Sequence, residues 1–195
     1  AMTIRKHPEL QIMFDTFKER EDTWSYGVCN GCQMVALLGW TSSCDVLEKD
    51  RPRFIKNKAG KFESRYSTLL IPESHSIMFK GMAGSVLPVW SDQGEGQVFA
   101  ALELLAKMKS DGNVPVLYAD NFGDETQKYP FNPNGSPLAI AGLCSSDGRH
   151  TIMMPHPERL FQTWQFSWLP EEMQNMKASP WLKIFQNARE WCKQN

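Results

Sequence analysis

Apolar residues recur at two different spacings along the chain, and these spacings predict both helices and strands. Over residues 7–22 they return every three or four positions behind Pro8, which suits the first turn of a helix, so an amphipathic helix is expected there. Short runs of apolar and β-branched residues bounded by turn residues predict strands at 24–28, 65–71, 86–90 and 114–119. Pro88 lacks an N–H, which places its strand at a sheet edge or makes it a strand end.

The rest of the chain adds helices, a hairpin and a long loop. Helices are predicted at residues 34–38, at 102–108 and from an N-cap at Ser179 to the C-terminus. Asp147-Gly148 stands between the apolar runs 138–144 and 149–154, which is typical of a hairpin. Residues 120–136 form a long loop, and such loops in compact domains tend to be functional. This order predicts one α/β domain over residues 1–195.

Composition excludes several classes of protein. The chain has 195 residues, 42% hydrophobic and 22% charged, which is typical of a globular chain and not of a disordered one. Lysine and arginine total 21 against 22 acidic residues, so no excess positive field favours nucleic acid. No apolar run approaches the roughly 20 residues that cross a bilayer, and five cysteines are no secreted disulfide framework. We therefore expect a cytoplasmic protein with neither a nucleic acid nor a membrane as partner.

The first candidate for chemistry is the segment Gly27-x-Cys29-x-Gly31, which lies between a predicted strand and a predicted helix. It has the form of a nucleophile elbow, in which flanking glycines avoid collisions with the strand and the helix. Cys29 would stand at a helix N-terminus, where the macrodipole favours the thiolate, and the backbone N–H of Asn30 would point into an oxyanion site. The same residues also fit a structural turn that holds a buried cysteine.

His156 is the candidate base for this thiol. In an extended segment, residues two apart project to the same side, so His156 and Glu158 can lie adjacent, and Pro157 favours the extended conformation at His156. A carboxylate beside an imidazole fixes its tautomer and stabilises the imidazolium that forms on proton transfer. Cys29, His156 and Glu158 therefore form a candidate catalytic triad.

Other interpretations of the same cysteines stay open. Cys29-x-x-Cys32 could be a zinc half-site or a redox pair, although no second Cys-x-x-Cys follows and Cys32 enters the helix. A cysteine hydrolase with another substrate would use the same elbow. The glycines at 81–84 and 94–96 do not fit the Gly-x-x-x-x-Gly-Lys-Ser/Thr phosphate cradle, so no ATP or other cofactor site is predicted in this chain.

Four blocks of sequence go beyond a generic elbow. They are residues 27–34 (GVCNGCQM), 132–137 (NPNGSP), 153–159 (MMPHPER) and 179–181 (SPW). In this order they resemble the class I (triad) glutamine amidotransferases, and within that family the C-terminal glutaminase domains of phosphoribosylformylglycinamidine synthases. The resemblance implies an α/β fold with a mostly parallel open sheet flanked by helices, similar to flavodoxin.

The resemblance also implies an activity. Cys29 would attack the side-chain amide of glutamine to give a thioester and ammonia, with His156 as acid and base and Glu158 as its partner. Gln33 matches a position that helps to hold glutamine in related amidotransferases. The ammonia would pass to a synthetase domain of the same polypeptide, which would bind ATP and Mg²⁺ and convert formylglycinamide ribonucleotide to its amidine in purine biosynthesis.

Two departures from the family pattern qualify this expectation. Gln93 stands where the family usually has a histidine before the Gly-Glu-Gly turn, which puts that histidine's role in doubt. The family's first strand and a glycine-rich loop that supplies an oxyanion N–H would precede Ala1. We therefore expect the chain to be a C-terminal fragment of a longer, multidomain polypeptide.

Overall fold

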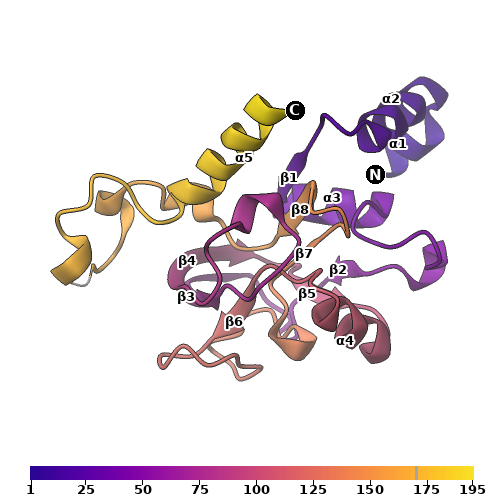
Figure 1. Cartoon of the computed structure of the whole chain (residues 1–195). Helices are drawn as coiled ribbons and strands as arrows, with labels where there is room; N and C mark the ends of the chain where they lie inside the picture. The colour runs from indigo at the N-terminus through magenta and orange to yellow at the C-terminus, as the bar shows by residue number, and fades with distance from the viewer. Residues whose placement is uncertain (170) are drawn as a thin grey trace.

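The computed structural model describes residues 1–169 and 171–195, and Figure 1 traces the chain through them. The helices are α1 (Met2–Lys6), α2 (Pro8–Glu19), α3 (Asn30–Leu38), α4 (Leu102–Ser110) and α5 (Leu182–Gln194). The strands are β1 (Ser25–Val28), β2 (Arg53–Ile55), β3 (Glu63–Leu70), β4 (Val86–Gln93), β5 (Gln97–Phe99), β6 (Leu117–Ala119), β7 (Gly142–Cys144) and β8 (His150–Met153). Short 3₁₀ helices join several of them, among them η2 (Ile77–Phe79), η3 (Pro137–Ala139) and η4 (Pro157–Arg159).

The sheet that leads to the candidate site has the order β1-β8-β7. β1 and β8 run parallel, with Val28 opposite Met153, and β7 pairs antiparallel with β8. The predicted turn at Asp147-Gly148 joins β7 to β8, and Gly148 has a φ of 75°, which glycine adopts without strain. Because β1 and β8 are parallel neighbours, the segments that follow them leave from the same edge of the sheet.

The other strands correct the expected topology. β3 pairs antiparallel with β4 and with β6, and β2 pairs antiparallel with β5. Within the described residues the fold is therefore α/β with small mixed sheets, and the pairing of β1 with β8 is its parallel part, where a mostly parallel sheet was expected. For β7 and β8 the physical reason is their tight turn, because so short a connection allows only antiparallel pairing.

One contiguous core joins these sheets to the helices. It combines side chains from α3, β3, β4, β6, β7, β8 and α5 with those of loop residues. Its largest fully buried side chains include Trp181, Tyr118, Leu69, Ile71, Met78 and Leu143. Trp181 precedes α5 and donates its indole N–H to the carbonyl of Pro88 at 2.7 Å, which fastens the last helix to the edge strand β4. Pro88 thus lies on an edge strand, as predicted.

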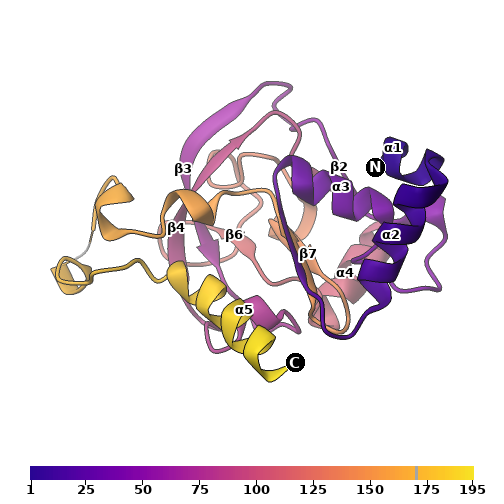
Figure 2. The ribbon, with the colours of Figure 1, turned by 90° about the horizontal axis from the view of Figure 1, so that it is seen from above.

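The helices on the two sides of β1 differ in how well they are covered. α2 and α5 stand apart in both views, and β1 lies between them in Figure 1 (Figures 1 and 2). α5 carries a buried face and contacts β1 through the edge-on rings of Tyr26 and Phe185. α2 has no buried residue, although Phe14 and Phe17 pack near the ring of Trp40. The amphipathic pattern therefore predicted this helix, but its apolar face is only partly covered.

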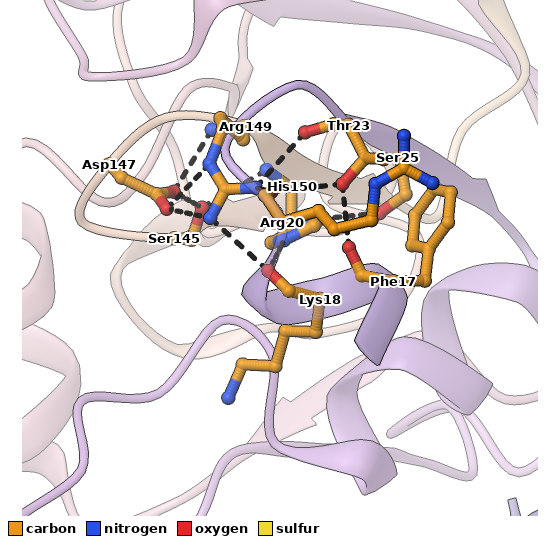
Figure 3. Close-up of polar contacts among 9 residues, drawn as sticks. All are labelled: Phe17, Lys18, Arg20, Thr23, Ser25, Ser145, Asp147, Arg149 and His150. Carbon is orange, nitrogen blue, oxygen red and sulfur yellow. Dashed lines mark hydrogen bonds and ion pairs between the residues drawn. The ribbon is translucent and has the colours of Figure 1, made fainter. Parts of the chain in front are cut away.

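The segment between α2 and β1 is tied to the β7–β8 turn by Arg149 (Figure 3). Its guanidinium donates to the carbonyl of Thr23 at 3.1 Å, to that of Lys18 at 3.2 Å and to that of Arg20. Asp147 accepts from the same guanidinium at 2.8–2.9 Å. The last turn of a helix leaves carbonyls without an intrahelical partner, and Arg149 satisfies that of Lys18 and that of the C-cap residue Arg20.

His150 completes this attachment from the start of β8 (Figure 3). Its Nδ1 lies 2.9 Å from the hydroxyl of Ser25, its Nε2 lies 3.4 Å from the carbonyl of Lys18, and its ring packs against Trp40. Only 1% of the residue is exposed, and burial lowers the pKa of this imidazole below its ordinary value of 6.5. The start of β1 is thus held against β8 by a buried, polar contact.

Most predicted elements are confirmed with small changes of length. The strands expected at 24–28, 65–71 and 86–90 are β1, β3 and β4, and the expected hairpin is β7–β8. Gly39 ends α3 with a left-handed φ of 79°, as its position predicted. The helix expected from Ser179 begins two residues beyond Pro180, because Ser179 and Trp181 first form a turn. Among the described residues, no helix is both long enough and apolar enough to cross a bilayer.

Candidate functional site

Cys29 lies in the tight turn between β1 and α3. Its φ of 54° and ψ of −112° are unusual for a residue with a side chain, and such strain concentrates at functional sites. Its N–H donates to the carbonyl of Met153 at 3.1 Å, and its carbonyl accepts from the N–H of Gln33 at 3.1 Å. The strand and the helix therefore hold Cys29 from both sides, as in a nucleophile elbow.

The two glycines beside Cys29 are not equivalent. A Cβ on Gly27 would lie 2.7 Å from the carbonyl oxygen of Gly31, so β1 can approach α3 only without a side chain at this position. A Cβ on Gly31 would meet nothing within 4 Å. The expectation that both glycines avoid collisions is therefore confirmed for Gly27 and wrong for Gly31, because the first turn of α3 leaves open space there.

His156 and Glu158 form a close pair beyond the end of β8. Nδ1 of His156 lies 2.6 Å from Oε1 of Glu158, and the main-chain N–H of His156 donates to the carbonyl of Trp90 at 2.8 Å. An ion pair of 2.6 Å between Arg159 and Asp92 joins the next residue to β4. The adjacency that the His-Pro-Glu spacing predicted is confirmed, but the extended conformation expected for this segment is wrong: Glu158 lies in the 3₁₀ helix η4, and this turn brings its carboxylate back to His156.

The other ring nitrogen of His156 is buried and unused. Only 7% of the residue is exposed, and Nε2 has no hydrogen-bond partner among the described residues. An unpaired buried polar atom costs free energy, so it indicates a functional requirement or a missing partner. Val28 and Met153 are opposite each other at the ends of the parallel strands β1 and β8. Cys29 directly follows Val28, and His156 comes three residues after Met153. Both residues therefore lie at the carboxyl edge of this strand pair.

The backbone beside Cys29 presents free donors. Asn30 is the first residue of α3, so its N–H is one of those that have no intrahelical acceptor. This position agrees with the donor expected for an oxyanion site. The helix dipole adds a partial positive charge at the same end, which stabilises nearby negative charge.

The second cysteine of the Cys-x-x-Cys segment has a different environment. Cys32 is fully buried in α3, and burial raises the pKa of its thiol well above the ordinary value, with the nearby Cys29 as a lesser cause. Redox partners and zinc ligands act as thiolates, which this environment disfavours. The described residues also contain no group of three or more His, Cys, Asp or Glu side chains that could hold a metal ion.

Gln33 projects from α3 one turn beyond Cys29 and meets a residue that the sequence alone did not indicate. Its amide Nε2 donates to Oε2 of Glu95 at 3.0 Å. Glu95 lies in the Gly94-Glu95-Gly96 turn between β4 and β5, 62 residues away in sequence. The signal in the sequence that could have found it is the acidic residue flanked by two glycines in this short turn.

The remaining candidates are structural neighbours of that turn. The side chain of Gln93 is buried and donates to Oδ1 of Asn134 at 3.0 Å, so it belongs to the interior. Asn134 belongs to the 132–137 loop and also contacts Asn57. The 132–137 loop thus supports the turn that carries Glu95.

Comparisons with known proteins agree with this geometry. The family model described as "CobB/CobQ-like glutamine amidotransferase domain" matches residues 1–192. The chain is 49% identical over 197 residues to "Probable phosphoribosylformylglycinamidine synthase, chloroplastic/mitochondrial" of Arabidopsis thaliana, with 98% of this chain and 14% of that protein covered. It is 43% identical over 203 residues to "Phosphoribosylformylglycinamidine synthase" of Homo sapiens, with 98% and 15% covered.

A solved structure shares the fold. The structure of PurLQS from Thermotoga maritima matches 85% of this chain and 60% of that chain, with a TM-score of 0.56 and 21% identity. The chain spans about 15% of the length of the curated relatives. The resemblance that the four sequence blocks indicated is confirmed, because the family model covers nearly every residue: the chain belongs to the CobB/CobQ-like glutamine amidotransferase domain family.

Proposed function

We propose that this chain is the glutaminase domain of a phosphoribosylformylglycinamidine synthase. The observation that carries the proposal is the arrangement at the carboxyl edge of β1 and β8. The strained Cys29 follows one strand, and the buried His156, paired with the exposed Glu158, follows the other, with Nε2 of His156 unpaired in the described residues. A thiol beside that nitrogen completes a nucleophile, a base and an orienting carboxylate.

The proposed chemistry uses these groups in sequence. Nε2 of His156 accepts the thiol proton, and the thiolate of Cys29 attacks the side-chain carbonyl carbon of glutamine. The N–H of Asn30 donates to the resulting oxyanion. His156 returns the proton to the departing nitrogen, which leaves as ammonia, and Cys29 keeps a γ-glutamyl thioester. Water then hydrolyses the thioester to glutamate and restores the thiol.

The fate of the ammonia belongs to the longer polypeptide. Since the relatives extend far beyond the matched region, we propose that a synthetase part of the same polypeptide takes up the ammonia. That part would bind ATP and Mg²⁺ and form formylglycinamidine ribonucleotide for purine biosynthesis. No step through ATP or Mg²⁺ is assigned to the residues of this chain.

A first strand and a glycine-rich loop ahead of residue 1, with the open parallel sheet that they would complete, stay a prediction. The order β1-β8-β7 supports it, because β1 is at the edge of its sheet in the described residues. An edge strand presents backbone donors and acceptors that another strand can pair with. A cytoplasmic location also stays a prediction. The Arabidopsis relative is named chloroplastic/mitochondrial, so imaging of the fluorescently tagged polypeptide is the test that distinguishes the compartments.

Two cysteine variants of the longest native polypeptide containing this sequence test the proposal. Cys29→Ser should lower glutamine-dependent synthesis by at least about 10³-fold, since removing a nucleophile abolishes covalent catalysis. Synthesis driven by added ammonium chloride should persist. Cys32→Ser is the matched control, and it should have a much milder effect because its thiol is fully buried in α3 and out of reach of a substrate. Equal losses from both variants would favour the redox alternative and contradict the glutaminase proposal.

A further inference from the structure

The contact between Gln33 and Glu95 lies one helical turn from Cys29. Cys29 is the N-cap of α3, and its carbonyl accepts from the N–H of Gln33 at 3.1 Å, which closes the first turn of the helix. The side-chain amide of Gln33 donates to Oε2 of Glu95 at 3.0 Å. The contact places a carboxylate within about one helical turn of the residue that carries the candidate nucleophile.

The charge of this carboxylate is not compensated. Glu95 is an exposed residue, and it forms no ion pair with any Lys, Arg or His among residues 1–169 and 171–195. The amide of Gln33 is a neutral donor. The site thus contains a negative group that is positioned by a hydrogen bond and can accept a cation.

The turn that carries Glu95 is held by one buried side chain. The N–H of Asn57 donates to the carbonyl of Gly94 at 3.0 Å, and its Oδ1 accepts from the N–H of Gly96 at 2.9 Å. Asn57 is 3% exposed. Because both flanking residues are bound to one asparagine, the main chain at Glu95 has little freedom to move.

A second buried amide holds Asn57 in turn. Nδ2 of Asn134 donates to Oδ1 of Asn57 at 2.7 Å, and Oδ1 of Asn134 accepts from Gln93 and from the hydroxyl of Tyr118. A Cβ on Gly96 would lie 2.3 Å from the Asn134 amide, so this network packs directly under the turn. Buried networks of this kind stiffen the groups they contact. An exposed acidic turn that served only solubility would not need such support.

Glutamine has a group that fits this carboxylate. Its α-ammonium nitrogen is separated from the side-chain amide carbon by four bonds, about 5 Å when extended. This length matches one helical turn of about 5.4 Å. With the amide carbon at Cys29, the ammonium group reaches the neighbourhood of Gln33 and Glu95.

We propose that Glu95, oriented by Gln33, binds the α-ammonium group of the substrate and makes the site select α-amino acid amides. This inference rests on the proposed glutaminase function. In it, Gln33 is a positioning residue whose contact with substrate is secondary, and Glu95 supplies the charge. A carboxylate that is positioned to pair with an ammonium discriminates against ligands that lack the cation, because they leave it without its partner.

The experiment compares two reagents that alkylate the nucleophile in the longest native polypeptide. One is 6-diazo-5-oxo-L-norleucine, which carries the α-ammonium, and the other is 6-diazo-5-oxohexanoate, which lacks it. Second-order rates of labelling at Cys29 are measured by peptide mass mapping. We expect the ammonium-bearing reagent to react at least about tenfold faster with the unaltered protein, and Glu95→Gln to remove most of this preference. The rate with 6-diazo-5-oxohexanoate should change little.

Two further variants make the result decisive. Glu103→Gln removes another exposed carboxylate, in the first turn of α4, and should keep the full preference. Glu95→Asp keeps the charge at a shorter reach and should restore part of it. A Glu95→Gln protein that retains the full preference for the ammonium-bearing reagent overturns this inference. Failure of both reagents to label Cys29 in the unaltered protein would instead overturn the glutaminase function on which it rests.

Discussion

At the residue scale, the nucleophile turn depends on one missing side chain. Gly27 has the carbonyl of Gly31 where its Cβ would be, and the N–H of Cys32 is 3.1 Å from the same point. The strand cannot move aside easily, because Val28 and Cys29 are fixed to β8 by the register and by the bond to Met153. Gly31 carries no such restriction.

A pair of alanine substitutions tests this asymmetry. Gly27→Ala should destabilise the β1–α3 junction by about 1–3 kcal/mol, which is typical of overpacking. Gly31→Ala should have little effect or stabilise α3 slightly, since alanine is a better helix former than glycine. The readout is the rate at which a thiol reagent modifies the buried Cys32 in the folded polypeptide. We expect this rate to rise about tenfold or more in Gly27→Ala and to stay unchanged in Gly31→Ala; equal rates would contradict the argument.

At the scale of elements, the junction between α2 and β1 depends on a residue of a different hairpin. The guanidinium of Arg149 is 14% exposed and donates to three carbonyls between Lys18 and Thr23 while it pairs with Asp147. α2 itself buries no residue. Its attachment therefore depends on this polar contact more than on its apolar face.

Arg149→Lys should loosen this junction, because an ammonium group cannot reach three carbonyls and a carboxylate in fork geometry. We expect a loss of about 1–3 kcal/mol of local protection, the cost of leaving buried acceptors without donors. Amide hydrogen exchange of peptides that cover residues 17–25 measures it. Arg20→Lys is the matched control, since Arg20 forms an exposed ion pair with Asp22 and such pairs contribute little. Unchanged exchange in Arg149→Lys would show that α2 is held otherwise.

At the scale of the whole molecule, the buried His150 links stability to pH. Burial is the main cause of its lowered pKa; the charges of Arg149 and Lys18 lower it further, while Asp147 and the Lys18 carbonyl act in the opposite direction. Ser25 and Trp40 contact the ring without charge. In the unfolded chain this imidazole binds a proton near pH 6.5, at higher pH than in the folded protein.

The sign of the effect follows from this difference. The contribution of His150 is fully present above about pH 6.5 and is lost as the pH falls below it, because protons then bind the unfolded state preferentially. We expect the temperature at the midpoint of thermal unfolding, followed by tryptophan fluorescence, to decrease when the pH is lowered from about 7.5 to about 5. In His150→Gln the midpoint itself should be lower at neutral pH and its pH dependence flatter. An identical slope in this variant would mean that other groups carry the effect.

Much of the site followed from local patterns because its parts are local. The elbow was indicated by the glycines around Cys29 between a strand and a helix, of which packing requires Gly27, and the adjacency of His156 and Glu158 was indicated by their separation of two residues around Pro157. Glu95 was missed, because it reaches Gln33 through a turn positioned by Asn57 and Asn134, which no spacing in the sequence relates to it.

The sequence by itself determined most of the longer elements and their order, the tight turn at Cys29 and the membership in the amidotransferase family. These properties depend on side-chain periodicity and on backbone preferences that act over a few residues. Only the tertiary structure decided that the sheets are small and mixed, that Gly27 and not Gly31 is required by packing, and that His156 leaves its second nitrogen unpaired. Those properties depend on distances between segments far apart in the chain, which are set by the packing of the common core.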